Sequence, residues 1–219
     1  MIVYWFLLLI TSIFAYGIGS MSTMVLASNY VFRTRLSRLG KGNIWISNFR
    51  RIYGIWGIIR LLMTELVKDI LPILLGGLLL GIKGHADVGR VFAGFCLTLG
   101  RLYPLFYDFR GSHATFCIIL TAMFANTTVG IAAAVVALAV VVLSRYISLA
   151  TLACTLMTVV VTVLLVDDAL ISRLVMFSCA LVFIKHIPAI GRLVNGREMR
   201  LSFEDDITYK LDQKFYRTH

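Results

Sequence analysis

The sequence predicts an all-α integral membrane protein with about seven transmembrane helices, and its composition and charge pattern carry that prediction. Hydrophobic residues make up 59% of the 219 residues and charged residues only 15%, whereas soluble domains are about 45–50% apolar. Most of the cations behind the net charge of +10 flank apolar runs. This placement indicates anchoring beside anionic lipid and argues against nucleic-acid binding, which needs a solvated basic face with stacking aromatic residues.

The expected helices follow one another with short connections. The first apolar run has no positive residues before it and exceeds the ~7–15 residues of a signal-peptide core, so we expect a retained helix. The run at 114–126 is short for a crossing, and the stretch at 52–63 suits a half-helix or an interfacial segment. The expected spans lie at about 3–29, 66–82, 91–107, 114–126, 128–143, 147–166 and 169–185.

The basic residues in short loops predict how these helices are oriented. Seven cations and no carboxylate lie between Arg33 and Arg60, so the positive-inside rule places this loop in the cytoplasm. Seven crossings then put the N-terminus outside and the C-terminus inside. We expect a membrane domain over 1–187 and a cytoplasmic tail over 188–219.

Three polar segments, at 40–51, 100–113 and 185–198, fall on the predicted cytoplasmic side. Polar groups at the edge of a membrane bundle are costly unless they pair or bind a ligand, so their convergence favours a lined cavity. In the first segment, glycine backbone, asparagine amides and Arg51 suit a phosphate. Plain topological anchoring explains the cations about as well, but it requires neither the glycines nor the asparagines.

Other candidates have both a chemical and a structural interpretation. Arg110 and His113 could bind an anion, although a lone histidine at a helix start is more often structural. Lys68 would add a phosphate-directed charge if it faced a polar cavity. Ser148 is equally well explained as a helix residue bonded to its own backbone, and Lys185 with His186 as the end of the last span.

The four cysteines occur singly in apolar segments, without a CxxC pair or a histidine at metal-ligand spacing. We therefore expect packing roles for the cysteines, and neither a metal nor a cofactor.

Six short segments, in their order along the chain, resemble the sequence patterns of a known enzyme family. They are Gly19-Ser20, KGNIWISNFRR at 41–51, ELVKD at 65–69, GRLYPLFYDFRGSHA at 100–114, RYISL at 145–149 and KHIPAIGRLVNGRE at 185–198. After an early Gly-Ser, the bacterial acyl-phosphate:glycerol-3-phosphate acyltransferases carry the patterns SGNxGAxNxxR, DxxKG, GHxxPxFxxFxGGKGxAT, RYxSL and RHxxNIxRLxxGxE. The likeness runs from about Gly19 to Glu198.

The resemblance has departures. The GGKG phosphate cradle of the family is replaced by Gly111-Ser112-His113-Ala114, and the asparagine of the last pattern by Ala189. Neutral His113 offers a weaker, pH-dependent charge in place of a permanent one. Lys41 is also new relative to the pattern, and our hypothesis is that it restores this charge.

The resemblance implies a seven-helix bundle in the bacterial inner membrane. Its reaction is attack of the sn-1 hydroxyl of glycerol 3-phosphate on an acyl phosphate, giving lysophosphatidate and phosphate without a covalent enzyme intermediate. The expected partners are these two substrates and membrane lipids. The expected catalytic residues are Arg51, Ser148 and His186, and the expected substrate-binding residues are Lys41, Gly42, Asn43, Asn48, Lys68, Arg110, Gly111, Ser112, His113, Arg145 and Arg192.

Three alternatives stay open at this point. The degenerate cradle is compatible with a paralogue that binds phosphate or lipid as a regulatory subunit, and equally with an acyltransferase for another acceptor alcohol. A small transporter is disfavoured, because apart from the set at 65–69 the span centres lack the ionisable groups that a pathway needs.

Overall fold

The computed structural model describes residues 2–23, 46–107, 111 and 114–198. The chain divides into two compact units. The first comprises Met1–Met21 with Leu66–Arg200, and the second Ser22–Glu65 with Leu201–His219. The polar groups analysed below lie in the first unit.

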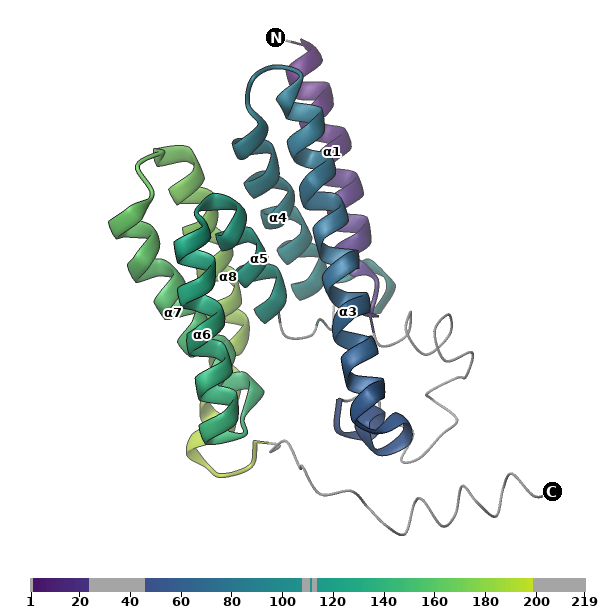
Figure 1. The fold of residues 1–219 in the computed structure, drawn as a ribbon, viewed down its shortest axis with the longest axis vertical. Helices are drawn as coiled ribbons and strands as arrows, with labels where there is room; N and C mark the ends of the chain where they lie inside the picture. The colour runs from purple at the N-terminus through teal and green to yellow at the C-terminus, as the bar shows by residue number, and fades with distance from the viewer. Residues whose placement is uncertain (1, 24–45, 108–110, 112–113, 199–219) are drawn as a thin grey trace, which may run out of the picture. The chain divides into compact units, whose positions relative to one another are not determined.

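All regular structure in the described residues is helical, which confirms the predicted all-α class (Figure 1). The first unit contains a short 3-10 turn, η3 (Leu105–Tyr107), after α4. Helix α3 begins in the second unit and continues into the first. The α-helices are α1 (Ile2–Ser20), α3 (Ile46–Gly81), α4 (Ala86–Leu102), α5 (Thr115–Ala125), α6 (Thr127–Ser144), α7 (Ile147–Leu165) and α8 (Ala169–Val194).

Within the described ranges, four helices are long and apolar enough to cross a bilayer by themselves, namely α1, α6, α7 and α8. Helix α5 is apolar but has only 11 residues, as expected for the short run at 114–126. A helix of that length spans only about 16 Å at 1.5 Å per residue. It therefore depends on its neighbours to reach across the hydrocarbon core.

Several predicted boundaries were wrong. The first helix ends at Ser20 and not near 29, because Met21 N bonds back to Ile18 O at 3.1 Å and closes a tight last turn. The last span was expected to stop at 185, but α8 continues through Pro188 to Val194, since membrane helices tolerate an interior proline.

Helices α3 and α4 also differ from the predicted spans. Within α3, residues 55–63 of the stretch at 52–63 are continuous with the expected span at 66–82. Gly54, with φ 66° and ψ −165°, interrupts that helix, a conformation that glycine adopts without steric cost. At the other end, α4 stops at Leu102 instead of 107.

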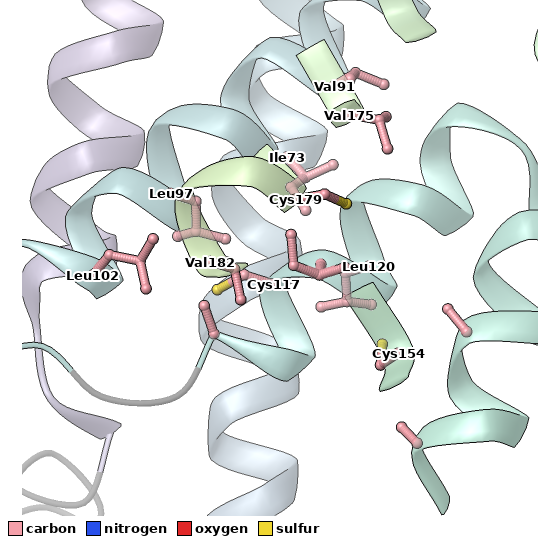
Figure 2. Packing of buried hydrophobic residues seen from close by; sticks show 14 of the residues in the cluster. Ile73, Val91, Leu97, Leu102, Cys117, Leu120, Cys154, Val175, Cys179 and Val182 are labelled. Atoms are coloured by element: carbon pink, nitrogen blue, oxygen red, sulfur yellow. The ribbon is translucent and has the colours of Figure 1, made fainter. Parts of the chain in front are cut away.

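Helix α4 is central to the first unit, where it packs against α1, α5 and α8. Figure 2 shows the apolar core, to which every helix from α3 to α8 contributes side chains. Helices α1 and α4 approach so closely that a Cβ on Gly19 would collide with Leu97 O, and one on Gly100 with Tyr16 O. The early Gly-Ser pair therefore has a packing role at this crossing.

One face of α7 is a stripe of buried hydroxyl residues. Ser148, Thr151, Thr155, Thr158 and Thr162 recur every three or four residues and are all at most 2% exposed, while Leu156, Val160, Val163 and Leu164 on the helix are exposed. The hydroxyls of Thr151, Thr155 and Thr158 donate to carbonyls of the preceding turn. The stripe turns Ser148, at the start of the helix, toward the bundle interior.

Candidate active site

Two adjacent residues of α3 and one residue of α4 form a buried group that we call the α3–α4 charge cluster: Lys68, Asp69 and Arg101. Their exposed fractions are 9%, 0% and 6%. Arg101 Nη2 donates to both carboxylate oxygens of Asp69 at 3.0 Å. Lys68 Nζ lies 3.5 Å from Asp69 Oδ1. Charge-assisted contacts of this kind are among the strongest in proteins, and burial reduces their screening by water.

Two neutral groups also contact the side chains of this cluster. Lys68 Nζ donates to Met21 O at 3.0 Å, so its charge lies at the C-terminal end of α1, where the helix dipole favours a cation. The thiol of Cys117, in the first turns of α5, donates to Asp69 Oδ2 at 3.4 Å. The cluster thus joins the end of α1, the middle of α3, the end of α4 and the start of α5.

A second group, the α7–α8 polar cluster, consists of Ser148, Arg192 and Glu198. The Ser148 hydroxyl donates to Glu198 Oε1 in a very short hydrogen bond. Arg192 Nε donates to Glu198 Oε2 at 2.6 Å. Ser148 is buried, whereas the Arg192 side chain is 51% exposed. Glu198 therefore connects a buried hydroxyl at the start of α7 with an accessible guanidinium at the end of α8.

Further contacts place both clusters at the same end of the bundle. The hydroxyls of Thr115 in α5 and Thr151 in α7 lie 2.6 Å apart, one turn from Ser148 and two residues from Cys117. Lys185 Nζ lies 4.5 Å from the centroid of the Tyr103 ring, just after α4, in the geometry of a cation–π contact. Polar groups of α3, α4, α5, α7 and α8 therefore gather where α1, α4 and α8 end and where α5 and α7 begin.

His186 is 5% exposed, and its Nδ1 lies 2.8 Å from Val182 O. In a neutral ring this contact places the proton on Nδ1 and makes Nε2 an acceptor. With the ring neutral, Nε2 is suited to accept a hydrogen bond, and His186 would donate from Nε2 only in its protonated form.

Two other predicted residues have defined backbone positions. Arg145 is exposed and ends α6 in the left-handed conformation, at φ 61° and ψ 16°. That conformation is uncommon for a residue with a side chain. Gly111 packs against the end of α4, where a Cβ would collide with the carbonyl oxygens of Arg101 and Leu102.

The structure therefore brings Ser148 and Arg192 together through Glu198, and it gives Lys68 an interior position. The other predicted residues cannot be placed in this way. The side chains of Asn48 and Arg51 lie outside the described part of α3. Also outside the described residues are Lys41, Gly42, Asn43, Arg110, Ser112 and His113.

Sequence reasoning did not select Asp69, Arg101 or Glu198 as site residues. Asp69 carried a usable signal, because a carboxylate inside an apolar span is a candidate for function. Asp69 and Arg101 also stand where the quoted patterns DxxKG and GHxxP have glycine and histidine. These two departures are partners in one ion pair, a relation that the separate motifs do not reveal.

The arrangement is suited to binding an anion and to moving a proton. Arg192 and Lys185 supply cationic groups, while Ser148 and His186 supply groups that exchange protons. In the described part of the chain, no group of three histidine, cysteine or acidic residues is placed to hold a metal ion. Fold and site together define an integral membrane protein with a polar, partly cationic centre at one end of a helical bundle.

The chain belongs to the glycerol-3-phosphate acyltransferase family, whose model matches residues 9–196. Among curated relatives, the glycerol-3-phosphate acyltransferase of Thermoanaerobacter pseudethanolicus is 24% identical over 198 residues, covering 90% of this chain and 98% of the relative. The enzyme of the same name from Francisella philomiragia is 27% identical over 190 residues, covering 86% and 90%.

Solved structures agree on the fold. The crystal structure of PlsY, an integral membrane glycerol 3-phosphate acyltransferase, in its glycerol 3-phosphate form has a TM-score of 0.71 to this chain at 24% identity. The match covers 89% of this chain and 96% of that one. Its lysophosphatidic acid form has a TM-score of 0.70. The likeness confirms the membrane-bundle prediction.

Proposed function

We propose that this protein is a glycerol-3-phosphate acyltransferase of the bacterial inner membrane, which transfers an acyl chain from acyl phosphate to the sn-1 hydroxyl of glycerol 3-phosphate. The observation that carries the proposal is the family match over residues 9–196, a range that contains nearly all of the polar groups described above. Curated relatives over 90% of the chain have the same printed name. The products are lysophosphatidate and inorganic phosphate.

The reaction needs the two substrates to be held in the right positions, and it needs no covalent intermediate with the enzyme. The hydroxyl oxygen of glycerol 3-phosphate forms a bond to the acyl carbonyl carbon, the bond from that carbon to the phosphate oxygen breaks, and the departing phosphate takes up the hydroxyl proton. The protein must hold two anions together and align the hydroxyl with the carbonyl. Arg192, 51% exposed, is an accessible cation for one of these phosphates.

The buried residues act around this reaction in distinct ways. Ser148 and Glu198 fix the position of Arg192, because the carboxylate binds both at once. His186, with Nδ1 held by Val182 O, presents Nε2 as an acceptor for a substrate hydroxyl. Arg145, at its constrained backbone position, supplies a second guanidinium between α6 and α7.

The proposed topology follows the sequence. The N-terminus lies outside, the membrane domain extends over 1–187, and the tail at 188–219 lies in the cytoplasm, with its first residues continuing α8. The basic segment at 33–60, Lys41, Gly42 and Asn43 included, faces the cytoplasm and contributes to phosphate binding. Membrane lipids surround the bundle.

The direct test is an assay of the purified full-length protein with palmitoyl phosphate and labelled glycerol 3-phosphate. We expect labelled lysophosphatidate and, as a matched control, the same rate from Asp87→Asn, because the exposed Asp87–Arg90 pair lies at the opposite end of α4. If no product forms above a vesicle control, the protein is a degenerate paralogue. Product with another alcohol alone would indicate a changed acceptor.

A further inference from the structure

The α3–α4 charge cluster has properties that stability does not explain. It keeps three ionisable side chains at 9% exposure or less. Replacing a buried ion pair by well-packed apolar residues is often neutral or even stabilising. Ionisable groups inside a membrane bundle are therefore functional candidates by default, and the question is what Asp69 contributes.

Asp69 contacts its two cationic neighbours, Lys68 and Arg101, much as a phosphate would. Both of its oxygens accept from Arg101 Nη2 at 3.0 Å, and Oδ1 lies 3.5 Å from Lys68 Nζ. Carboxylate and phosphate oxygens are bound by guanidinium and ammonium groups in the same way. An internal carboxylate at this place lowers the positive charge of the cluster by one unit.

The cluster lies where that charge can act on substrate. Lys68 holds Met21 O at the end of α1, and the backbone of Arg101 packs against Gly111 in the segment after α4. Cys117, which contacts Asp69, is two residues from Thr115 and its contact with α7. An anion held at this end of the bundle is therefore within the range over which buried charges act with little screening.

We propose that Asp69 is a built-in counter-anion that weakens the attraction of Lys68 and Arg101 for the substrate phosphate, and thereby sets the affinity for glycerol 3-phosphate. The inference rests on the proposed function, whose site it refines. Asp69 acts through the two cations and does not touch the substrate, so it is a positioning and affinity-setting residue and not a catalytic one.

The proposal makes affinity depend on the charge of the cluster and not on the identity of any one side chain. At an effective dielectric constant of about 20, a unit charge about 10 Å from a monoanion changes its affinity by roughly tenfold. Asp69→Asn adds one positive unit, Arg101→Gln removes one, and the double variant restores the original charge. Asparagine matches aspartate in size, whereas glutamine is shorter than arginine, and the double variant separates this packing loss from the change in charge.

The experiment measures the KM for glycerol 3-phosphate and the inhibition constant of inorganic phosphate for the four proteins of this series. We expect both constants to fall in Asp69→Asn, to rise in Arg101→Gln, each by roughly tenfold, and to return to within about twofold of the wild-type value in the double variant. Asp87→Asn at the far end of α4 should leave both unchanged. Constants that worsen in both single variants and worsen further in the double variant would refute the proposal, since that order indicates lost packing.

Leaving one buried charge without its partner is strongly destabilising, so a single variant can fail to fold. A second comparison, between the double and a triple variant, covers that case. The double variant keeps the charge of Lys68 alone, and adding Lys68→Met removes it from a cluster that is otherwise neutral. We expect the phosphate inhibition constant to rise roughly tenfold between the double and the triple variant. Equal constants would overturn the proposal. Absence of activity in the wild-type protein would instead refute the proposed function, so the two failures are distinguishable.

Discussion

The contact between Ser148 and Glu198 leads to a prediction whose size can be worked from the structure. Ser148 is 1% exposed and the Glu198 side chain 10%, so water screens their bond little. A hydrogen bond to a charged group contributes about 1.5–3 kcal/mol. The bond from Arg192 to the same carboxylate is half exposed and should contribute less than about 1 kcal/mol.

We therefore expect Ser148→Ala and Glu198→Gln each to lower the free energy of unfolding by about 2 kcal/mol. Glutamine keeps an oxygen that can accept from Ser148 but loses the charge that strengthens the bond. The double variant should therefore cost about the same as one single variant, because either change already removes the charge-assisted bond. Arg192→Lys serves as the control within the cluster, and it should change stability by less than about 1 kcal/mol.

The protein carries its own probes for this measurement. All four of its cysteines are buried thiols: Cys96, Cys117, Cys154 and Cys179. A thiol-reactive dye therefore reports unfolding as SDS is titrated into the detergent-solubilised protein. Strictly additive costs for Ser148→Ala and Glu198→Gln, with a coupling below about 0.5 kcal/mol, would show that the two residues do not form the bond described here.

Two further predictions concern backbone geometry. Arg145→Gly should retain or slightly raise the unfolding midpoint, because glycine adopts φ 61° without strain. If the Arg145 guanidinium binds substrate, the same change should lower turnover at least tenfold, and unchanged turnover would remove Arg145 from the site. Gly100→Val should lower the unfolding free energy by roughly 3 kcal/mol, because the valine side chain meets Tyr16 O. Gly191→Ala is the control: nothing lies within 4 Å of the added Cβ, so it should be neutral in the same titration.

Long apolar runs allowed the fold class to be predicted, but not the ends of the helices. Hydropathy does not distinguish the end of α1 at Ser20 from the apolar residues that follow, because the end depends on a local backbone bond. The last span was expected to end at Lys185, before Pro188, which has no N–H to donate to a helix. In a membrane bundle, neighbouring groups compensate for the missing N–H, and α8 continues to Val194.

The candidate site was predictable in part, for a related reason. Ser148 and Arg192 were selected from local patterns, but Glu198, which joins them, is 50 residues from Ser148 in the chain. The partners Asp69 and Arg101 are 32 residues apart. A single sequence gives residue types along the chain, and long-range partners depend on which helices pack together.

The crossing of α1 and α4 at Gly19 and Gly100 has a consequence for how relatives of this protein are recognised. Neither position can carry a side chain while the two helices stay in contact, whatever reaction the bundle performs. A relative that had lost its chemistry but kept this close crossing would still need both glycines. Matching these two positions in a newly sequenced genome thus indicates shared architecture, while evidence of acyl transfer must come from residues whose loss would leave the bundle intact.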